Sequence, residues 1–502
     1  MARHANKAPC APLAVAPKIC RCARPDRPAE RRFFVFETMH PSRPESRIIT
    51  GPLWSQILSF VFPLALSGVL QQLFNAADVA IVGRFTGAQG PAAMAAVGAC
   101  SPIIGLLVTL FIGISLGANV TISTAIGSGD RKTVQRAVHT SLMVALVGGA
   151  ALAAVSEVFA GPVLRALDVP AEVLPLAITY LRIFLIGMPV ILLYNFEAAI
   201  FMSAGNTRAP LIVLAVAGAL NIVLNLLFVL GLKMSVGGVA IATVLSDGLS
   251  AALLLAWLGK THSTVRFRMA ALKIDPRILA RILKIGVPAG MQAAVFSLAN
   301  IIIQSAINSL GTTVMAASSA AFNIEILAYC ILNAFSQACT TFVGQNNGAG
   351  KIARCRSTMG WCFLEGALCL AASTALILLT GHSLLALFNT DPQVVAIGYT
   401  RLLWIFAAYI FTISYEIISG YLRGFGISLL PAILTTIAIC GVRIGWVYGI
   451  FPRRPDFETI MACYPASLAT AAVFMFALLL YVRPAAKRLT ELRTAKIAAA
   501  AA

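Results

Sequence analysis

The chain alternates between long runs of apolar residues and short gaps that hold glycine, proline and charged residues. From Gly51 onward, twelve such runs can be marked off. Each is close to or longer than the ~20 residues that a helix needs to cross the hydrocarbon of a bilayer. The pattern therefore predicts twelve transmembrane helices, at residues 54–82, 93–125, 138–160, 173–203, 209–231, 236–257, 278–309, 314–345, 358–379, 393–422, 429–450 and 460–481.

The first six runs resemble the last six. Pro63 stands near the start of the first run and Pro288 near the start of the seventh, and an asparagine follows each at a matching distance, Asn75 and Asn300. Because six spans is an even number, both halves begin on the same side, which makes a parallel repeat with a substrate path between two lobes. The expected parts are a basic cytoplasmic tail (1–50), a six-helix lobe (51–257), an interlobe linker (258–277), a second six-helix lobe (278–483) and a C-terminal tail (484–502).

Composition agrees with this class. Of 502 residues, 59% are hydrophobic and 11% are charged, whereas an ordinary soluble domain has about 25% charged residues. A soluble protein this apolar could not cover its surface with polar groups, so lipid must be the solvent for much of it. We therefore expect an all-α integral protein of the cell membrane that crosses the bilayer many times.

The formal net charge is +19, and the positions of the basic residues along the chain bear on its orientation in the membrane. With the N-terminus inside, the cytoplasmic gaps and the C-terminal tail hold nineteen Lys and Arg, against five in the opposite gaps. This bias predicts that both termini are cytoplasmic. Residues 1–47 are basic and proline-rich and lack a secretory signal, so we expect a disordered tail, with Met39 as an alternative start. No aromatic-and-basic RNA-binding motif is present, and nucleic-acid binding is not expected.

Motifs for enzyme chemistry are missing from the sequence. There is no P-loop, zinc-protease motif or nucleophile elbow, so we expect neither ATP hydrolysis nor another enzymatic activity, and no cofactor. The eleven cysteines are scattered, mostly within apolar runs, and their spacing does not suggest a zinc site or any other metal site. The five histidines lie in tails or near the ends of spans, which argues against a histidine proton relay.

Ionisable residues inside the predicted spans are expensive, so each requires a partner or a function. Asp78 is the strongest candidate, because Gln71, Asn75 and Asp78 share one face of the first helix. A carboxylate facing a cavity can be held neutral by desolvation and can exchange its ion as the conformation changes. The alternative is a structural carboxylate that packs helices together. The other candidates are Glu197, Asp247, Glu325, Glu365 and Glu416, with Arg182, Arg401 and Arg443.

Neutral polar residues add to this set. Asn221 and Asn225 lie one turn apart on the fifth span and Thr243 lies on the sixth, where they could bind a cation or bridge helices. Gln71, Asn75, Glu325 and Glu416 are candidates for the substrate cavity. Glu197 could also contact a cationic substrate. Pairing with a basic neighbour is the alternative for Glu197, Glu325 and Glu416, with Arg182 and Arg401 as possible partners.

Pro63 lies early in the first helix of its lobe, as Pro288 does in the other. A proline inside a helix removes one hydrogen bond and permits bending. Bending of the first helix as Asp78 changes state would make a gate, and a static kink is the alternative.

Several segments in order resemble the multidrug and toxic compound extrusion (MATE) exporters of the DinF-like branch. They are Gly-Pro-Leu-Trp-Ser-Gln (51–56), Gln-Gln-Leu-Phe-Asn (71–75) with Asp78, Ala-Gly-Asn-Thr (204–207), Leu-Asn-Ile-Val-Leu-Asn (220–225), Gly-Gly-Val-Ala-Ile-Ala-Thr (237–243) and Val-Gly-Gln-Asn (343–346). The resemblance covers residues 50–483.

The resemblance implies two six-helix lobes that form a V, alternating access, and a cation site in the first lobe. The family's site residues match Asp78, Tyr180, Asn221 and Thr243. Many relatives carry aspartate where this chain has Asn225, which lowers the charge available to sodium. The coupling ion is therefore left as proton or sodium.

These observations predict a secondary antiporter. It would export organic, cationic amphipathic compounds in exchange for protons or sodium, without ATP, and function as a monomer. A flippase for lipid-linked saccharides is one alternative, for which a cationic cavity that binds pyrophosphate would be expected. A non-transporting membrane scaffold is another.

Overall fold

The computed structural model describes residues 47–86, 90–167, 169–261 and 263–501. Contacts within the chain separate residues 1–42 from residues 43–502, and everything that follows belongs to the second unit. The predicted disordered tail and the alternative start at Met39 lie outside the described residues.

Regular structure in the described residues is helical throughout. The α-helices are α1 (Arg47–Thr50), α2 (Leu53–Phe85), α3 (Gly90–Gly127), α4 (Arg131–Ala166), α5 (Leu174–Ile186), α6 (Met188–Ser203), α7 (Arg208–Leu226), α8 (Ser235–Lys260), α9 (Pro276–Asn308), α10 (Thr312–Gly348), α11 (Ile352–Ala386), α12 (Pro392–Gly424), α13 (Leu429–Thr436), α14 (Val442–Gly449), α15 (Phe457–Val482) and α16 (Pro484–Ala501). Turns of π-helix follow α7 (Leu227–Gly231) and α13 (Ile437–Gly441), and short 3₁₀ turns occupy Met269–Ala271 and Phe451–Arg453.

Eleven described segments are long and apolar enough to cross a bilayer, and the bent pair α5 and α6 makes a twelfth when it is counted as one span. The predicted all-α membrane fold is thus confirmed. The fourth span differs from the expected single helix because it bends by 48° between α5 and α6. The break falls at Gly187, and Pro189 follows within the first turn of α6, where it has no N–H to continue the hydrogen bonding of α5.

Large apolar side chains cover much of the helix surface. Leu379 is 86% exposed and Phe62 is 70% exposed, and many other large apolar side chains along the spans are exposed to a lesser degree. Patches of this kind would be a liability in water, but they are suited to lipid, where the backbone bonds of helices need no water.

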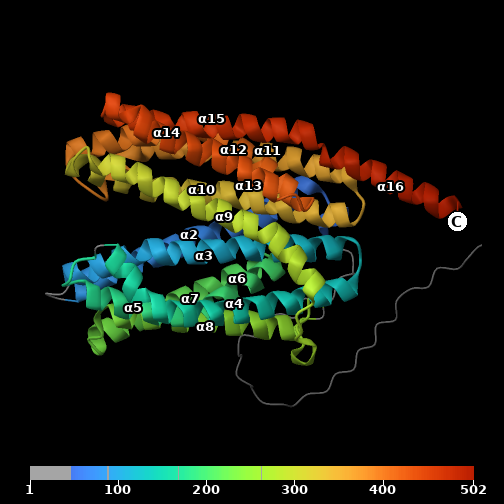
Figure 1. Ribbon diagram of the computed structural model, residues 1–502, viewed down its shortest axis with the longest axis horizontal. Helices are drawn as coiled ribbons and strands as arrows, with labels where there is room; N and C mark the ends of the chain where they lie inside the picture. The colour runs from blue at the N-terminus through green and yellow to red at the C-terminus, as the bar shows by residue number, and fades with distance from the viewer. Residues whose placement is uncertain (1–46, 87–89, 168, 262, 502) are drawn as a thin grey trace, which may run out of the picture. The chain divides into compact units, whose positions relative to one another are not determined.

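The helices gather into two groups (Figure 1). One cluster of buried apolar residues joins the later part of α2 to α3–α8, and two others join helices of the second half. The start of α2, including Ile57 and Phe60, belongs to the second half's cluster. The first helix therefore links both groups. The predicted lobe boundaries at 257 and 278 stay a prediction.

Close packing of α3 against α9 connects the two groups. A Cβ atom on Gly113 of α3 would lie 2.2 Å from the Cα of Gly290 of α9, and one on Gly117 would lie 2.2 Å from the carbonyl oxygen of Ile282. Only glycine permits this approach, as small residues do at other helix contacts in membranes.

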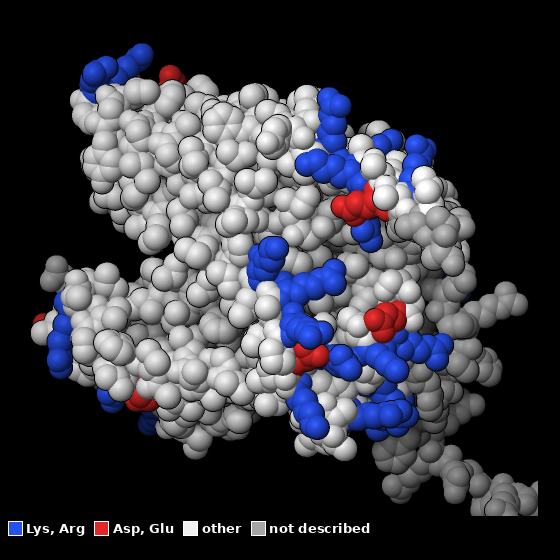
Figure 2. Space-filling view, turned by 45° about the vertical axis from the view of Figure 1, so that its right-hand side comes forward, with Lys and Arg blue, Asp and Glu red and all other residues white. Residues whose placement is uncertain are grey.

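Basic residues collect at one end of the unit, around the α3–α4 turn, the α8–α9 segment and the start of α11 (Figure 2). We call this the basic end. The white surface is hollowed between the two groups at the opposite end. At the basic end Asp130 caps α4, and hydrogen bonds from the hydroxyl and N–H of Thr133 hold the pKa of the Asp130 carboxyl below its usual value.

Candidate functional site

The contact between α2 and α7 positions the candidate site. Phe74 of α2 fits against Gly218 of α7, where a Cβ atom would lie only 1.9 Å from the Phe74 ring. The missing side chain lets the two helices approach closely. One turn beyond Phe74, Asp78 reaches Asn225 of α7.

Asp78 accepts hydrogen bonds from two other helices. The Asn225 Nδ2 lies 2.6 Å from Asp78 Oδ1, and the Thr243 hydroxyl of α8 lies 3.4 Å from Asp78 Oδ2. The structure thus brings together three of the residues that the sequence nominated, from α2, α7 and α8.

The two asparagines of α7 extend the network. Asn225 Nδ2 also lies 3.0 Å from Asn221 Oδ1, and Asn221 Nδ2 lies 3.5 Å from the Thr243 hydroxyl. Both asparagines are buried, and the Oδ1 atom of Asn225 has no partner among the described residues. The N–H groups of Asn225 therefore point at oxygen atoms within the cluster.

Tyr180 is buried on α5, with its ring centroid 6.2 Å from that of Phe184. It lies within electrostatic reach of Asp78. We refer to Asp78, Tyr180, Asn221, Asn225 and Thr243 as the Asp78 cluster. Its residues come from four helices of the first half of the chain.

Gln71 and Asn75 do not join this network. Both are exposed, and the Asn75 amide nitrogen lies 3.4 Å from Gln72 Oε1. Asp78 is turned toward α7 and α8 instead. The polar face expected on α2 is therefore divided: the Asp78 carboxylate packs against other helices, whereas the amides of Gln71 and Asn75 are exposed. A role of these two amides in a substrate cavity stays a prediction.

Glu325 of α10 forms a buried ion pair with Arg401 of α12. Arg401 Nε lies 2.6 Å from Glu325 Oε1, and Arg401 Nη2 lies 3.0 Å from Glu325 Oε2. Only 3% of Arg401 is exposed. The pairing that sequence analysis gave as an alternative is therefore present, and a role of Glu325 in substrate binding stays a prediction.

Glu416 of α12 accepts a hydrogen bond of 3.2 Å from the Tyr329 hydroxyl of α10 and is buried. Its role in substrate binding likewise stays a prediction. Pro63 is buried inside α2, which continues through it without interruption, and the Ser67 hydroxyl lies 2.9 Å from the Pro63 carbonyl oxygen.

Sequence analysis gave Asp247 no role of its own. The structure places it on α8, one turn beyond Thr243 and within electrostatic reach of Asp78. The spacing of four residues between Thr243 and Asp247 is the signal that could have linked them, because residues i and i+4 share a helix face. Among the described residues no group of three or more His, Cys, Asp and Glu side chains could hold a metal ion.

The hydrogen bonds of the cluster suit the ionised form of one carboxyl group. The Asn225 N–H and the Thr243 hydroxyl stabilise the ionised form, because they donate to its oxygens. A proton on Asp78 would turn one acceptor into a donor, and the neighbouring amide and hydroxyl would have to rearrange. Uptake of a proton by Asp78 would therefore require a change in the contacts among α2, α7 and α8.

Comparisons with known proteins agree with this arrangement. The family model described as MatE matches residues 63–227 and 288–448, one segment in each half. The chain is 27% identical over 436 residues to the "Probable multidrug resistance protein YoeA" of Bacillus subtilis (strain 168), covering 84% of this chain and 93% of that protein. It is 28% identical over 395 residues to the "Probable multidrug resistance protein NorM" of Thermotoga maritima, covering 78% and 84%.

A solved structure shares the fold. It is titled "Outward-facing conformation of a multidrug resistance MATE family transporter of the MOP superfamily", and it superposes with a TM-score of 0.80 at 22% sequence identity. The match covers 90% of this chain and 99% of that chain. The predicted two-lobed architecture is confirmed by this match.

Proposed function

The chain belongs to the MatE family of multi-pass membrane transporters, and from this we propose that it is a secondary antiporter that exports organic, cationic amphipathic compounds in exchange for protons. The observation that carries the ion coupling is the Asp78 carboxylate, which is held by hydrogen bonds from α7 and α8. The similarity to multidrug resistance proteins supports the substrate class. We also assign the chain to the DinF-like branch on the segments quoted above.

The donors around Asp78 favour protons over sodium. The cluster contains one carboxylate, and Asn225 presents an N–H group to it. Sodium is bound by oxygen ligands, as other hard cations are, so the amide of Asn225 would have to turn before its oxygen could take part. A proton needs no such ligand set.

The driving force is sufficient. A membrane potential of about 100 mV supplies about 2.3 kcal/mol for each charge that moves, and one pH unit supplies about 1.4 kcal/mol. Together, one proton can hold a neutral compound at a gradient of several hundredfold, whereas for a cation exchanged one for one the charges balance and the pH difference alone supports about tenfold for each pH unit.

We propose that transport proceeds by alternating access. Protonation of Asp78 would change the packing of α2, and Pro63 would give that helix its bending point, since no backbone N–H is available there. Because α2 is buried against both halves of the chain, its bending can move one group against the other. The basic end would face the cytoplasm, with both termini there, and the monomer would be the working unit.

Flux through purified protein tests the function. Proteoliposomes loaded with ethidium, an amphipathic cation, should release it when a proton gradient is imposed and should stop when an ionophore collapses that gradient. Protein-free liposomes are the control. Release driven by a sodium gradient alone would show that sodium, and not the proton, is the coupling ion. Movement of a fluorescent lipid-linked saccharide without ethidium release would favour a flippase, and movement of neither would favour a scaffold.

A further inference from the structure

Two acidic residues within the helices of the first half have no partner among the described residues. Glu197 of α6 is 0% exposed, and neither of its carboxyl oxygens has a hydrogen-bond partner among the described residues. Asp247 of α8 is partly buried and likewise has neither a hydrogen bond nor an ion pair within the described part of the chain. Buried polar groups are nearly always hydrogen-bonded, and an ionisable residue at membrane depth marks a function by default.

The register of α8 places Asp247 next to the Asp78 cluster. Thr243 contacts Asp78, and Asp247 follows Thr243 by four residues on the same face of α8. At 1.5 Å per residue the step along the helix is about 6 Å. Asp247 therefore lies one turn from the cluster, in the direction of Lys260 and the basic end.

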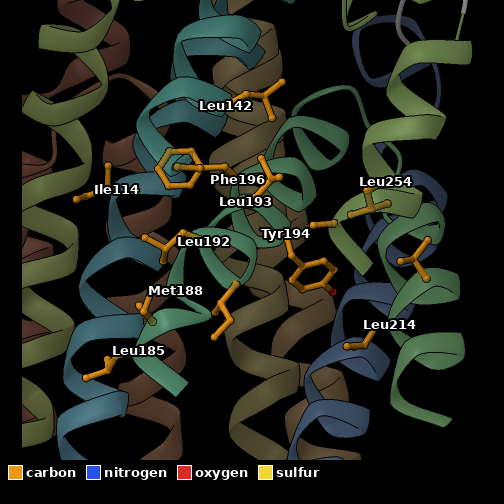
Figure 3. Packing of buried hydrophobic residues seen from close by; sticks show 14 of the residues in the cluster. Ile114, Leu142, Leu185, Met188, Leu192, Leu193, Tyr194, Phe196, Leu214 and Leu254 are labelled. Carbon is orange, nitrogen blue, oxygen red and sulfur yellow. The ribbon is translucent and has the colours of Figure 1, made fainter. Parts of the chain in front are cut away.

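Packing of α6 against α8 places Tyr194 and Glu197 of α6 further toward the basic end than Asp247. Gly187, just before α6, lies against Val244 of α8, where a Cβ atom would come within 2.3 Å of the Val244 side chain. Tyr194 lies two turns further along α6 and is within electrostatic reach of both Asp247 and Glu197. Figure 3 shows Tyr194 among the buried apolar side chains of this half.

Both helices end at the basic end. The carbonyl of Ser203, the last residue of α6, accepts a hydrogen bond from Gln345 near the end of α10, and Gln345 also lies against Gly127 at the end of α3. Just beyond α8, the Arg268 backbone bonds His139 in the third turn of α4. Asp78, Asp247, Tyr194 and Glu197 thus follow one another toward that end.

We propose that Asp247 and Glu197 relay protons between the Asp78 cluster and the basic end of the first half. This inference rests on the proposed proton antiport. When Asp78 loses its proton, the Asp247 carboxylate takes it. Asp247 then passes a proton to Glu197, directly or through the Tyr194 hydroxyl, which accepts one proton while it gives up its own. Glu197 releases a proton at the basic end, so each group returns to its starting form and one proton has moved.

The other titratable groups on the surrounding helices either bond elsewhere, lie beside Asp78, or lie near helix ends. On α4, His139 bonds the backbone oxygens of Gln135 and Arg268, and Glu157 pairs with Arg182 of α5. The remaining groups on helices α2 to α8 are Cys100, which bonds the Ala177 carbonyl, Tyr180 beside Asp78, and the basic residues near helix ends, namely Arg84, Arg131, Lys132, Arg136, Arg165, Arg208 and Lys260. None of them bonds Asp247 or Glu197 in the described residues.

Two transport assays on the same proteoliposomes test the relay. Gradient-driven ethidium release requires protons to cross, whereas exchange of labelled for unlabelled ethidium at equal pH requires only substrate movement. Glu197→Gln and Asp247→Asn should each slow gradient-driven release by about a hundredfold, the order of effect expected for a positioned proton-transfer group. Exchange should stay within about twofold of wild type. Glu197→Asp should recover much of the gradient-driven release, because it restores a titrating carboxyl.

Glu365→Gln provides the matched control. Glu365 of α11 is also buried with both oxygens unpartnered, but it lies in the other half of the chain. It should behave as wild type in both assays. Wild-type gradient-driven release in both Glu197→Gln and Asp247→Asn would overturn the relay, and so would equal loss of exchange and release in proteins with unchanged melting temperatures. Failure of the proposed function is a different result, because the wild-type protein would then show no gradient-driven release.

Discussion

The choice of coupling ion at Asp78 depends on whether its neighbours direct hydrogen-bond donors or oxygen atoms toward its carboxylate. The Asn225 N–H and the Thr243 hydroxyl both donate to its oxygens, so the chain surrounds one carboxylate with neutral donors. Two carboxylates in one site would repel each other, and a bound cation would relieve that repulsion, so the affinity of the site for a cation would rise. Asn225 is therefore the residue at which the choice of ion can be changed.

Asn225→Asp should strengthen sodium dependence relative to proton dependence. The change adds a second carboxylate 3.0 Å from Asn221 and in direct contact with Asp78. Ethidium release should then rise with a sodium gradient, measured in proteoliposomes over a sodium series. Asn389→Asp, in the turn after α11, adds the same charge far from the site and should leave the ion profile unchanged. An unchanged profile in folded Asn225→Asp protein would contradict the assignment of α7 to the site.

The ion pair of Glu325 with Arg401 is a second feature at this scale. Glu325→Gln would leave the Arg401 guanidinium buried without a counter-charge, which typically lowers the free energy of unfolding by about 3–5 kcal/mol. A clear fall in melting temperature in detergent is expected. Glu491→Gln removes an exposed partner of Arg488 and should change the melting temperature little. Equal melting temperatures for both variants would show that the buried pair contributes nothing.

Among the elements, the apolar runs predicted the spans well, because each transmembrane helix must satisfy its own backbone bonds in lipid. The break between α5 and α6 was not predicted. Residues 173–203 form one continuous apolar run in the sequence. Gly187 leaves room for the Val244 side chain of α8, and this contact is visible only in the folded structure. The same holds for the α3–α9 contact, since glycines are common in membrane helices.

Gly113→Val tests that contact. Its side chain would meet the backbone of Gly290, where even a Cβ atom lies 2.2 Å from the nearest atom. The helices would have to separate, and overpacking of this kind typically destabilises by about 1–3 kcal/mol. Gly105→Val, on the same helix with nothing within 4 Å of its Cβ position, is the control. A lower melting temperature is expected for Gly113→Val alone, and similar values for both would contradict the packing described here.

For the molecule as a whole, the internal repeat and the charge bias were visible in the sequence, and the two-lobed fold agrees with the repeat. The candidate site was foreseen only in part. The positions of Asp78, Asn221, Asn225 and Thr243 were nominated, but the sequence could not show that Gln71 and Asn75 would stay outside the network. Helix periodicity gives a shared face but not the rotation of that face toward a neighbour.

Orientation in the membrane can be measured by labelling. A cysteine at Arg453, in the turn between α14 and α15, should react with an impermeant thiol reagent added outside intact cells, in a background without native cysteines. A cysteine at Arg266 in the α8–α9 segment should react only after permeabilisation. The reverse pattern would invert the topology.

The central claim is that the charge on Asp78 couples the ion to the substrate, and Asp78→Asn tests it most directly. The amide keeps the shape and hydrogen-bonding capacity of the side chain but cannot bind a proton. Gradient-driven ethidium release should vanish, while the melting temperature of the same preparation is retained or rises, because a partly buried charge has been removed. Full gradient-driven release by a stable Asp78→Asn protein would contradict the mechanism.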